Sequence, residues 1–261
     1  MSSFDYVPIE LFAESLLYRY WAIAAVVTLA AMLSSIAGFA FAAFAGSVMF
    51  HLVDDAAYAV QIMIVASIGT QITGVLSIRR SIDWRAVCPF LIGGALTIVP
   101  GVYLLFHIAP QLYLRAIGVF LAIYGACMLF RRPIVISMGG SRSLLADLFV
   151  GSLGGIMAPL AAFPGAFISI WCGMRGWDKL RQRAIYQPYI LVMQIASLHL
   201  IHIATASGGY DLFLLLYALP AVVGTHLGLR VFQQLTNTQF SKVLNVFIIL
   251  SGLTLAAGSK S

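Results

Sequence analysis

Long apolar segments follow one another through most of this chain, and its fifteen lysines and arginines lie between or beside them. Hydrophobic residues make up 61% of the 261 residues and charged residues only 9%, which is typical of polytopic membrane proteins and not of soluble domains. An apolar segment of roughly twenty residues crosses the ~30 Å hydrocarbon core of a bilayer as a helix. The chain is therefore predicted to be an all-α integral membrane protein.

Six apolar segments have the length of one ordinary crossing, and they cover residues 57–78, 86–106, 112–130, 184–206, 212–229 and 240–257. Two more, 21–52 and 144–174, are about thirty residues long, roughly 45 Å as one helix, which exceeds a simple crossing. Both carry helix-interrupting residues near their middle, namely Ser34, Ser35 and Gly38 in the first, and Gly154, Gly155, Pro159, Pro164 and Gly165 in the second. Each is either a kinked continuous helix or a broken, re-entrant hairpin.

The distribution of basic residues distinguishes these two interpretations. If both long segments cross the bilayer, eight basic residues fall on one side and seven on the other, so there is no bias. If both are re-entrant hairpins, one side keeps only Arg19, Arg115 and Lys260, and the other side holds the remaining twelve. The positive-inside rule favours the second arrangement, with both termini outside. The net charge of +6 is then an orientation signal, and nucleic-acid binding is not needed to explain it.

A weak internal repeat supports the hairpin arrangement. A shift of 127 residues aligns, without a gap, Gly38 with Gly165, Val65 with Val192, Ile68 with Ile195, Gly101 with Gly228, Arg115 with Lys242 and Gly125 with Gly252. Both interrupted segments and the three spans after each keep this register. One hairpin and three spans make an odd number of crossings, so the second half is predicted to be inverted relative to the first, as in many secondary transporters.

The predicted organisation has four parts. Residues 1–19 form an amphipathic segment, 20–131 the first repeat half, 132–142 a cytoplasmic linker, and 143–258 the second repeat half. We expect each half to consist of one re-entrant hairpin and three transmembrane helices.

The paired breaks also predict where a ligand binds. If each hairpin turns near the bilayer midplane, the returning half-helices start after Gly38 and Gly165 with free N–H groups, and such helix N-termini bind anions. No lysine or arginine lies in the middle of a predicted span. We therefore expect a neutral site that is built mainly from backbone.

Polar side chains at matching depth add to this predicted site. Ser67 and Gln194 are related by the 127-residue shift, Gln71 follows Ser67 by one turn, and Gln187 and Ser197 share the stripe of Gln194. The alternative for each side chain is a hydrogen bond to a neighbouring helix. The predicted substrate-binding residues are Ser34, Ser35, Gly38, Phe39, Ser67, Gln71, Gly165, Ala166, Gln187, Gln194 and Ser197.

Other chemistry finds less support in the sequence. His199, His202 and His226 lie in predicted spans, where a proton-coupling role and a structural role both stay open. Coupling to H⁺, coupling to Na⁺ and transport without a coupling ion are the alternatives. The three cysteines are widely spaced, and no H-E-x-x-H, G-x-S-x-G or phosphate-binding Gly-Lys motif occurs. We expect no catalytic residue, no metal, no cofactor and no enzymatic activity.

The interrupted segments and glycine-spaced spans resemble the sulfite exporter TauE/SafE family of bacterial membrane proteins. The resemblance covers about residues 24–257, through Ser34-Ser35-Ile36-Ala37-Gly38-Phe39, Gly151-Ser152-Leu153-Gly154-Gly155, Pro100-Gly101 with its counterpart 224–228, and the spans that begin with Arg115 or Lys242. It implies export or uptake of sulfur-containing anions such as sulfite, sulfonates or sulfoacetate across the inner membrane.

Taken together, these features predict a secondary transporter of a small organic or inorganic sulfur-containing anion, which works by alternating access in the bacterial inner membrane. Both termini are expected in the periplasm, and the expected partners are the anion, the bilayer and, if transport is coupled, H⁺ or Na⁺. The alternatives are an anion channel and a membrane scaffold or assembly factor without substrate turnover.

Overall fold

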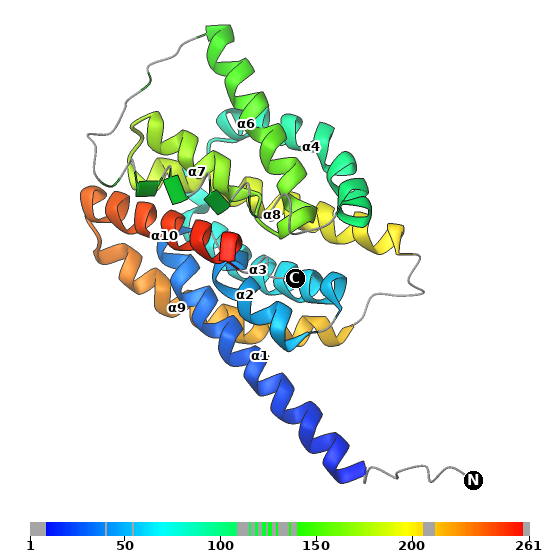
Figure 1. Cartoon of the computed structure of the whole chain (residues 1–261). Coiled ribbons are helices and arrows are strands. Elements are labelled where there is room, and N and C mark those ends of the chain that lie inside the picture. The colour runs from blue at the N-terminus through cyan, green and yellow to red at the C-terminus, as the bar shows by residue number, and fades with distance from the viewer. Residues whose placement is uncertain are drawn as a thin grey trace.

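The computed structural model describes residues 9–39, 41–53, 55–108, 140–205 and 212–257, together with scattered positions between 115 and 136. Over these residues all regular secondary structure is helical (Figure 1). The first part of the chain forms α1 (Ile9–Ala37), α2 (Phe41–Leu52), α3 (Ala56–Ile78), the 3₁₀ helix η1 (Arg79–Ser81) and α4 (Trp84–His107). The second part forms α6 (Gly140–Ala161), α7 (Gly165–Met174), α8 (Lys179–Ala204), the 3₁₀ helix η2 (Leu212–Tyr217), α9 (Ala218–Gln234) and α10 (Asn237–Ala257).

Membrane-crossing length is reached by six helical segments of the described part, namely Tyr18–Ala37, Tyr58–Ser81, Trp84–His107, Ser143–Ala161, Lys179–Ala204 and Leu212–Gln234. Four of them coincide with predicted single spans, and two with the first limbs of the predicted interrupted segments. The predicted span 112–130 falls mostly outside the described residues, and 240–257 belongs to α10. The chain is therefore a multi-pass, all-α membrane protein, as its composition predicts.

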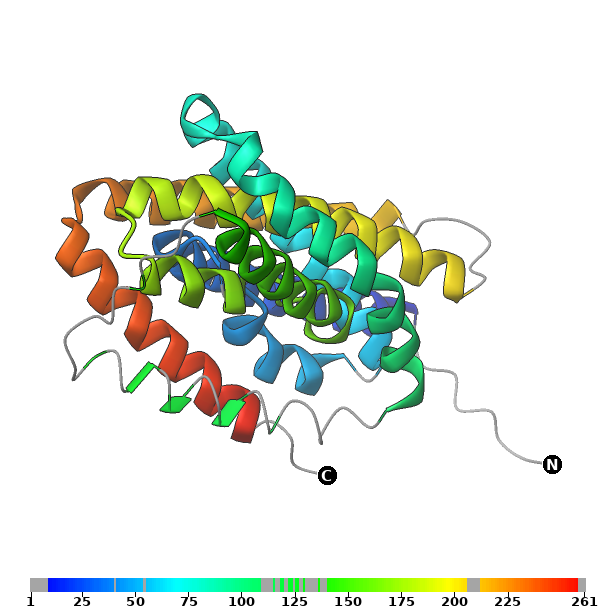
Figure 2. The ribbon, with the colours of Figure 1, turned by 90° about the horizontal axis from the view of Figure 1, so that it is seen from above.

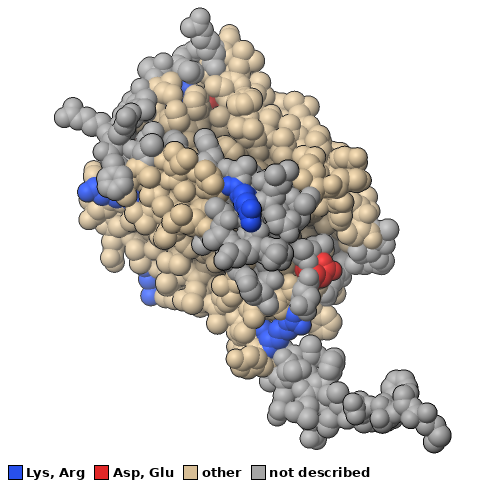
Figure 3. Space-filling model, viewed as in Figure 1, with Lys and Arg blue, Asp and Glu red and all other residues tan. Residues whose placement is uncertain are grey.

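The surface of the helical bundle is apolar where a membrane would touch it. Large side chains of α4 and α9 are exposed, among them Leu96 at 72%, Tyr103 at 61% and Leu219 at 65%. On the face shown in Figure 3, lysine, arginine and carboxylate side chains are sparse. Extended exposed apolar surface is rare on soluble monomers and normal for helices that face acyl chains.

Both interrupted segments are broken helices and not continuous kinked ones. In the first, α1 ends at Ala37, Gly38 adopts the left-handed region with φ of 83°, and α2 begins at Phe41. In the second, α6 ends at Ala161, Ala162 has φ of 51°, and α7 begins at Gly165. The local reason is that Gly38 has no Cβ to oppose a positive φ, whereas Pro164 has no N–H to continue α6.

Each break joins a long limb to a short one. The segment Tyr18–Ala37 has 20 residues, a full crossing length, whereas α2 has 12 residues and α7 has 10. The second limbs pack against the first, α2 on α1 and α7 on α6. In each hairpin the first limb therefore has the length of a full crossing, whereas the second limb is about half as long.

Glycines allow the closest helix contacts in the bundle. The most extensive pairings are α4 with α6, which lie side by side in Figure 2, and α1 with α9. A Cβ added to Gly93 or Gly151 would collide with the facing backbone at Leu148 or Phe90, and one added to Gly228 would collide with the carbonyl of Met32. Small residues at these positions let the helix backbones touch, as is common in membranes.

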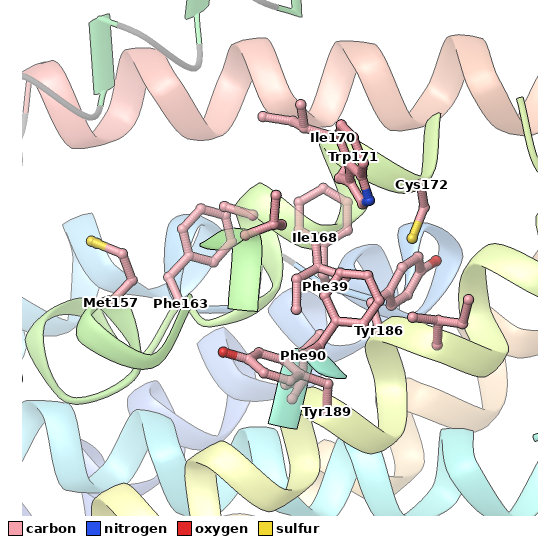
Figure 4. Close-up of a cluster of buried hydrophobic side chains, with 14 of the residues drawn as sticks. Phe39, Phe90, Met157, Phe163, Ile168, Ile170, Trp171, Cys172, Tyr186 and Tyr189 are labelled. Atoms are coloured by element: carbon pink, nitrogen blue, oxygen red, sulfur yellow. The ribbon is translucent and has the colours of Figure 1, made fainter. Parts of the chain in front are cut away.

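The two breaks meet in the interior, and each packs into the core of the opposite part of the chain. Phe39, just after the first break, belongs to the hydrophobic cluster of α6, α7 and α8, where Figure 4 shows it beside Tyr186. Ala162, at the second break, belongs to the cluster of α1, α2 and α3. The rings of Phe39 and Phe163 stack with centroids 5.9 Å apart. The breaks are therefore buried on both sides by the opposite half.

Candidate functional site at the helix breaks

All of the predicted substrate-binding residues are buried in the structure. They do not form one continuous hydrogen-bonded cluster. Instead, they divide into a polar group at the first break, a second group where α3 crosses α8, and the start of α7 at the second break.

The first break is contacted by α3 through an amide. Gln71 Nε2 donates to the carbonyl of Gly38 at 3.4 Å, which places this predicted residue at the predicted break. The hydroxyls of Ser34 and Ser35 instead donate to the carbonyl of Ala31 in their own helix, at 3.4 and 2.5 Å. Both hydroxyl groups therefore have their hydrogen-bond acceptor within α1, and they point back along that helix.

A buried cation lies at this break, where the sequence predicted only neutral groups. Arg183 is completely buried, with 0% of its side chain exposed. Its Nη2 donates to the carbonyl of Ser35, and its guanidinium carbon lies 3.9 Å from the ring centroid of Phe232. In the amide orientation that satisfies both groups, the Gln187 oxygen accepts from Nε at 3.0 Å and Nη2 at 3.2 Å.

Arg183 was not among the predicted site residues, because in the sequence it follows other basic residues and was assigned with them to a loop. The structure starts α8 at Lys179, with the Asp178 side chain as its N-cap, so Arg183 lies inside the helix. A helical signal for it exists, since Arg183, Gln187 and Gln194 follow at spacings of four and seven and share one face.

A second side chain of α8 holds the end of α1. Tyr186, which is fully buried, donates its hydroxyl to the carbonyl of Ala37 at 2.5 Å, and its ring meets that of Phe39 edge to face at 6.2 Å. Arg183 and Tyr186, which are about one turn apart on α8, thus donate hydrogen bonds to the carbonyls of Ser35 and Ala37 at the end of α1. A helix C-terminus carries partial negative charge, so a cation there is electrostatically favourable.

At the second break, the predicted residues Gly165 and Ala166 form the first turn of α7. Pro164 is the N-cap, and no side chain caps this end. A Cβ added to Gly165 would lie 3.0 Å from the Cβ of Phe39, so the start of α7 directly faces the first break. The two predicted breaks are thus adjacent in space.

The second polar group lies at the crossing of α3 and α8. Gln194 Nε2 donates to Ser67 Oγ at 2.7 Å. Within the described part of the chain, the Gln194 and Gln71 amide oxygens and the Ser197 hydroxyl have no hydrogen-bond partner, although all three are buried. Unpaired buried polar atoms are costly, so they mark this crossing as a place suited to a polar ligand.

The histidines lie apart from these groups. His199 and His226 are exposed, His202 is half-buried, and a ring nitrogen of His226 pairs with the carbonyl of Val222 in its own helix at 2.8 Å. Among the described residues, no three or more histidine, cysteine or carboxylate side chains gather as metal ligands would.

Comparison with known proteins places the chain in a family. The sequence model of the family described as sulfite exporter TauE/SafE matches residues 23–255, which is nearly the whole chain and close to the range of the resemblance. No curated protein and no solved structure matches the chain. With the match spanning both helix breaks and every predicted site residue, this protein belongs to the sulfite exporter TauE/SafE family.

Proposed function

We propose that the protein is a secondary transporter that moves a small sulfur-containing anion, such as sulfite, a sulfonate or sulfoacetate, across the bacterial inner membrane. Family membership supports both transport and the class of anion, and the six crossing-length helices support the membrane location. The substrate anion binds at the adjacent helix breaks.

The observation that carries this proposal is the buried guanidinium of Arg183. Burying an arginine in a membrane protein is costly unless it is paired or serves function. Its partners among the described residues are carbonyl and amide oxygens and one aromatic ring, with no carboxylate among them. A net positive charge therefore stays inside the bundle beside two helix breaks, and a small anion is the ligand that neutralises it.

We also infer that 20–131 and 143–258 are inverted repeats, and equivalent contacts support this. Under the 127-residue shift, the contact of Gly155 with Thr97 corresponds to that of Gly224 with Thr28. Contacts between repeats that occur in pairs, each exchanged for the other when the two halves are swapped, are the signature of a two-fold axis between the halves.

Two further pairs of contacts obey the same rule. The approach of Gly101 to Pro159 corresponds to that of Gly228 to Met32, and Gly125 meets Ile249 as Gly252 meets Ala122. The halves then alternate between two relative positions, and each position opens the breaks to one side of the membrane.

Flux into proteoliposomes tests the function. Purified protein is first screened for thermal stabilisation by sulfite, thiosulfate, taurine, sulfoacetate, carboxylates and cations, because a ligand that binds only the folded state raises the apparent Tm. The anion that stabilises is then followed as radiolabelled flux, with imposed H⁺ or Na⁺ gradients to identify the coupling ion.

For a carrier, we expect uptake that saturates as the anion concentration rises. Unlabelled anion on the other side of the membrane should accelerate this uptake. Flux without competition or trans-stimulation would assign a channel instead. A folded sample that neither is stabilised by nor transports any of these anions would overturn the proposal.

A further inference from the structure

We propose that Arg183 binds the substrate anion with the same guanidinium that holds the end of α1, so that anion binding releases the first break from α8. This inference rests on the proposed function and names the residue and the motion through which the anion acts. Three observations support it: the hydrogen bonds of Arg183, the positive φ of Gly38, and the separate hydrogen bond from Tyr186 to Ala37.

The guanidinium has one nitrogen to spare. Nε and Nη2 are engaged by the oxygens of Gln187 and Ser35, whereas Nη1 is buried and has no hydrogen-bond partner within the described residues. An arginine binds an oxyanion best in a planar fork, through two nitrogens at once. A fork that uses Nη1 and Nη2 needs the nitrogen that now donates to Ser35.

An anion and the carbonyl of Ser35 would compete for Nη2 of Arg183, and the anion is the stronger acceptor. Both bonds are charge-assisted by the guanidinium, but an oxyanion brings a full negative charge and two oxygens that accept in parallel, whereas the carbonyl of Ser35 is a single acceptor with only a partial charge. Once the guanidinium is neutralised by an anion, it no longer complements the negative end of α1. α2 also begins just after the same break, and the N–H groups of a helix's first turn, which have no partner within the helix, favour an anion.

The break can move when it is released. Gly38 supplies the positive φ between α1 and α2, and it is closely enclosed by α8: a Cβ at this position would lie 2.7 Å from the ring of Tyr186 and 3.1 Å from Arg183 Nε. Of the ties at this break, anion binding removes the one from Arg183 Nη2 to Ser35, three residues before this glycine. Tyr186 provides a second tie, through Ala37, that does not involve the guanidinium.

The test uses sulfite binding and backbone hydrogen exchange on the full chain in lipid nanodiscs. Affinity is measured by isothermal titration calorimetry, and exchange is followed by mass spectrometry on a peptide that contains the end of α1 and the start of α2. The variants are Arg183→Gln, Arg183→Lys and Tyr186→Phe. Arg181→Gln is the matched control, because Arg181 is exposed, lies two residues away on α8 and stacks on Trp177.

For the wild type and Arg181→Gln, we expect sulfite to increase exchange in this peptide. Arg183→Gln should weaken sulfite binding by about 10-fold or more and exchange rapidly without sulfite, since charged hydrogen bonds are lost on both sides. Arg183→Lys, which keeps the charge and loses the fork, should fall between the two. Tyr186→Phe should speed exchange and strengthen sulfite binding roughly 2- to 10-fold, because the anion then works against one tie fewer.

Wild-type sulfite affinity in folded Arg183→Gln would overturn the role of Arg183 and leave the proposed transport intact. Faster exchange in Tyr186→Phe with unchanged or weaker sulfite binding would overturn the competition, and this variant decides the matter if Arg183→Gln does not fold. Failure of the folded wild type to bind any sulfur anion would instead defeat the proposed function, and this inference with it.

Discussion

Gln194 donates a hydrogen bond to Ser67 at 2.7 Å, and the two residues are 127 positions apart, the same shift that aligns the two halves of the chain. Both side chains are buried. Two equivalent residues of a pair of repeats touch each other only close to the axis that relates the repeats. The bond therefore marks the crossing of α3 and α8 as the centre of the proposed inverted repeat.

Replacing Ser67 and Gln194 by alanine, singly and together, should show that they are coupled. We expect each single change to lower the free energy of unfolding by about 1 kcal/mol and the coupling energy to be about 0.6 kcal/mol, the average for hydrogen bonds between membrane helices. Steric-trap unfolding in bicelles measures these values. We also expect the double variant to bind sulfur anions more weakly at nearly normal folded yield; unchanged affinity would remove both residues from the site.

Gly38→Ala should destabilise the protein by about 2 to 5 kcal/mol. The positive φ costs an alanine roughly 1 to 2 kcal/mol, and overpacking against Tyr186 adds about 1 to 3 kcal/mol. The matched control is Gly173→Ala in α7, where a Cβ meets nothing within 4 Å and should be neutral or slightly stabilising. Equal Tm values for the two variants would show that the close approach at Gly38 does not exist.

Trp171→Phe should loosen the second hairpin without unfolding it. The indole N–H of Trp171 donates to Asp147 Oδ1 at 2.7 Å and so joins α7 to α6. We expect a loss of about 1 kcal/mol from removal of this bond. Asp147→Asn keeps an acceptor at the same place and should cost less. Thermal unfolding of both variants checks the order, and a larger loss for Asp147→Asn would assign the main role of Asp147 to another partner.

Cysteine labelling tests the topology. In a background with Cys88, Cys127 and Cys172 replaced by alanine, Thr205→Cys should react with an impermeant maleimide in intact cells. Ser81→Cys and Thr236→Cys, also at exposed positions, should react only after permeabilisation, because the proposed hairpin topology puts both in the cytoplasm.

Labelling at positions 81 and 236 distinguishes the hairpin topology from one in which both interrupted segments cross the bilayer. If both interrupted segments crossed the bilayer, these two positions would lie on opposite sides, so labelling of one without the other would disprove the hairpin topology. Labelling of both in intact cells, with Thr205→Cys protected, would preserve the hairpins and reverse the orientation.

Local features of the sequence predicted much of this structure. Segment length and hydropathy determine whether a helix can cross a bilayer, and they identified the class of protein. Glycine and proline act within one turn of the backbone, so they located the interruptions around Gly38 and Pro164, and the distribution of basic residues favoured broken over kinked helices there. The 127-residue shift likewise singled out Ser67 and Gln194, which the structure joins.

The sequence by itself therefore determined the membrane class and the helix-interrupting positions, because each depends on residues that are neighbours along the chain, and the repeat register paired Ser67 with Gln194. Only the tertiary structure decided the charge and contacts of the site. Arg183 belongs by sequence to a group of cations beside a span, and it became a buried partner of Ser35 because α8 starts early enough to carry it inward and the end of α1 packs onto it. A charge becomes buried through contacts between segments nearly 150 residues apart, and no local pattern records them.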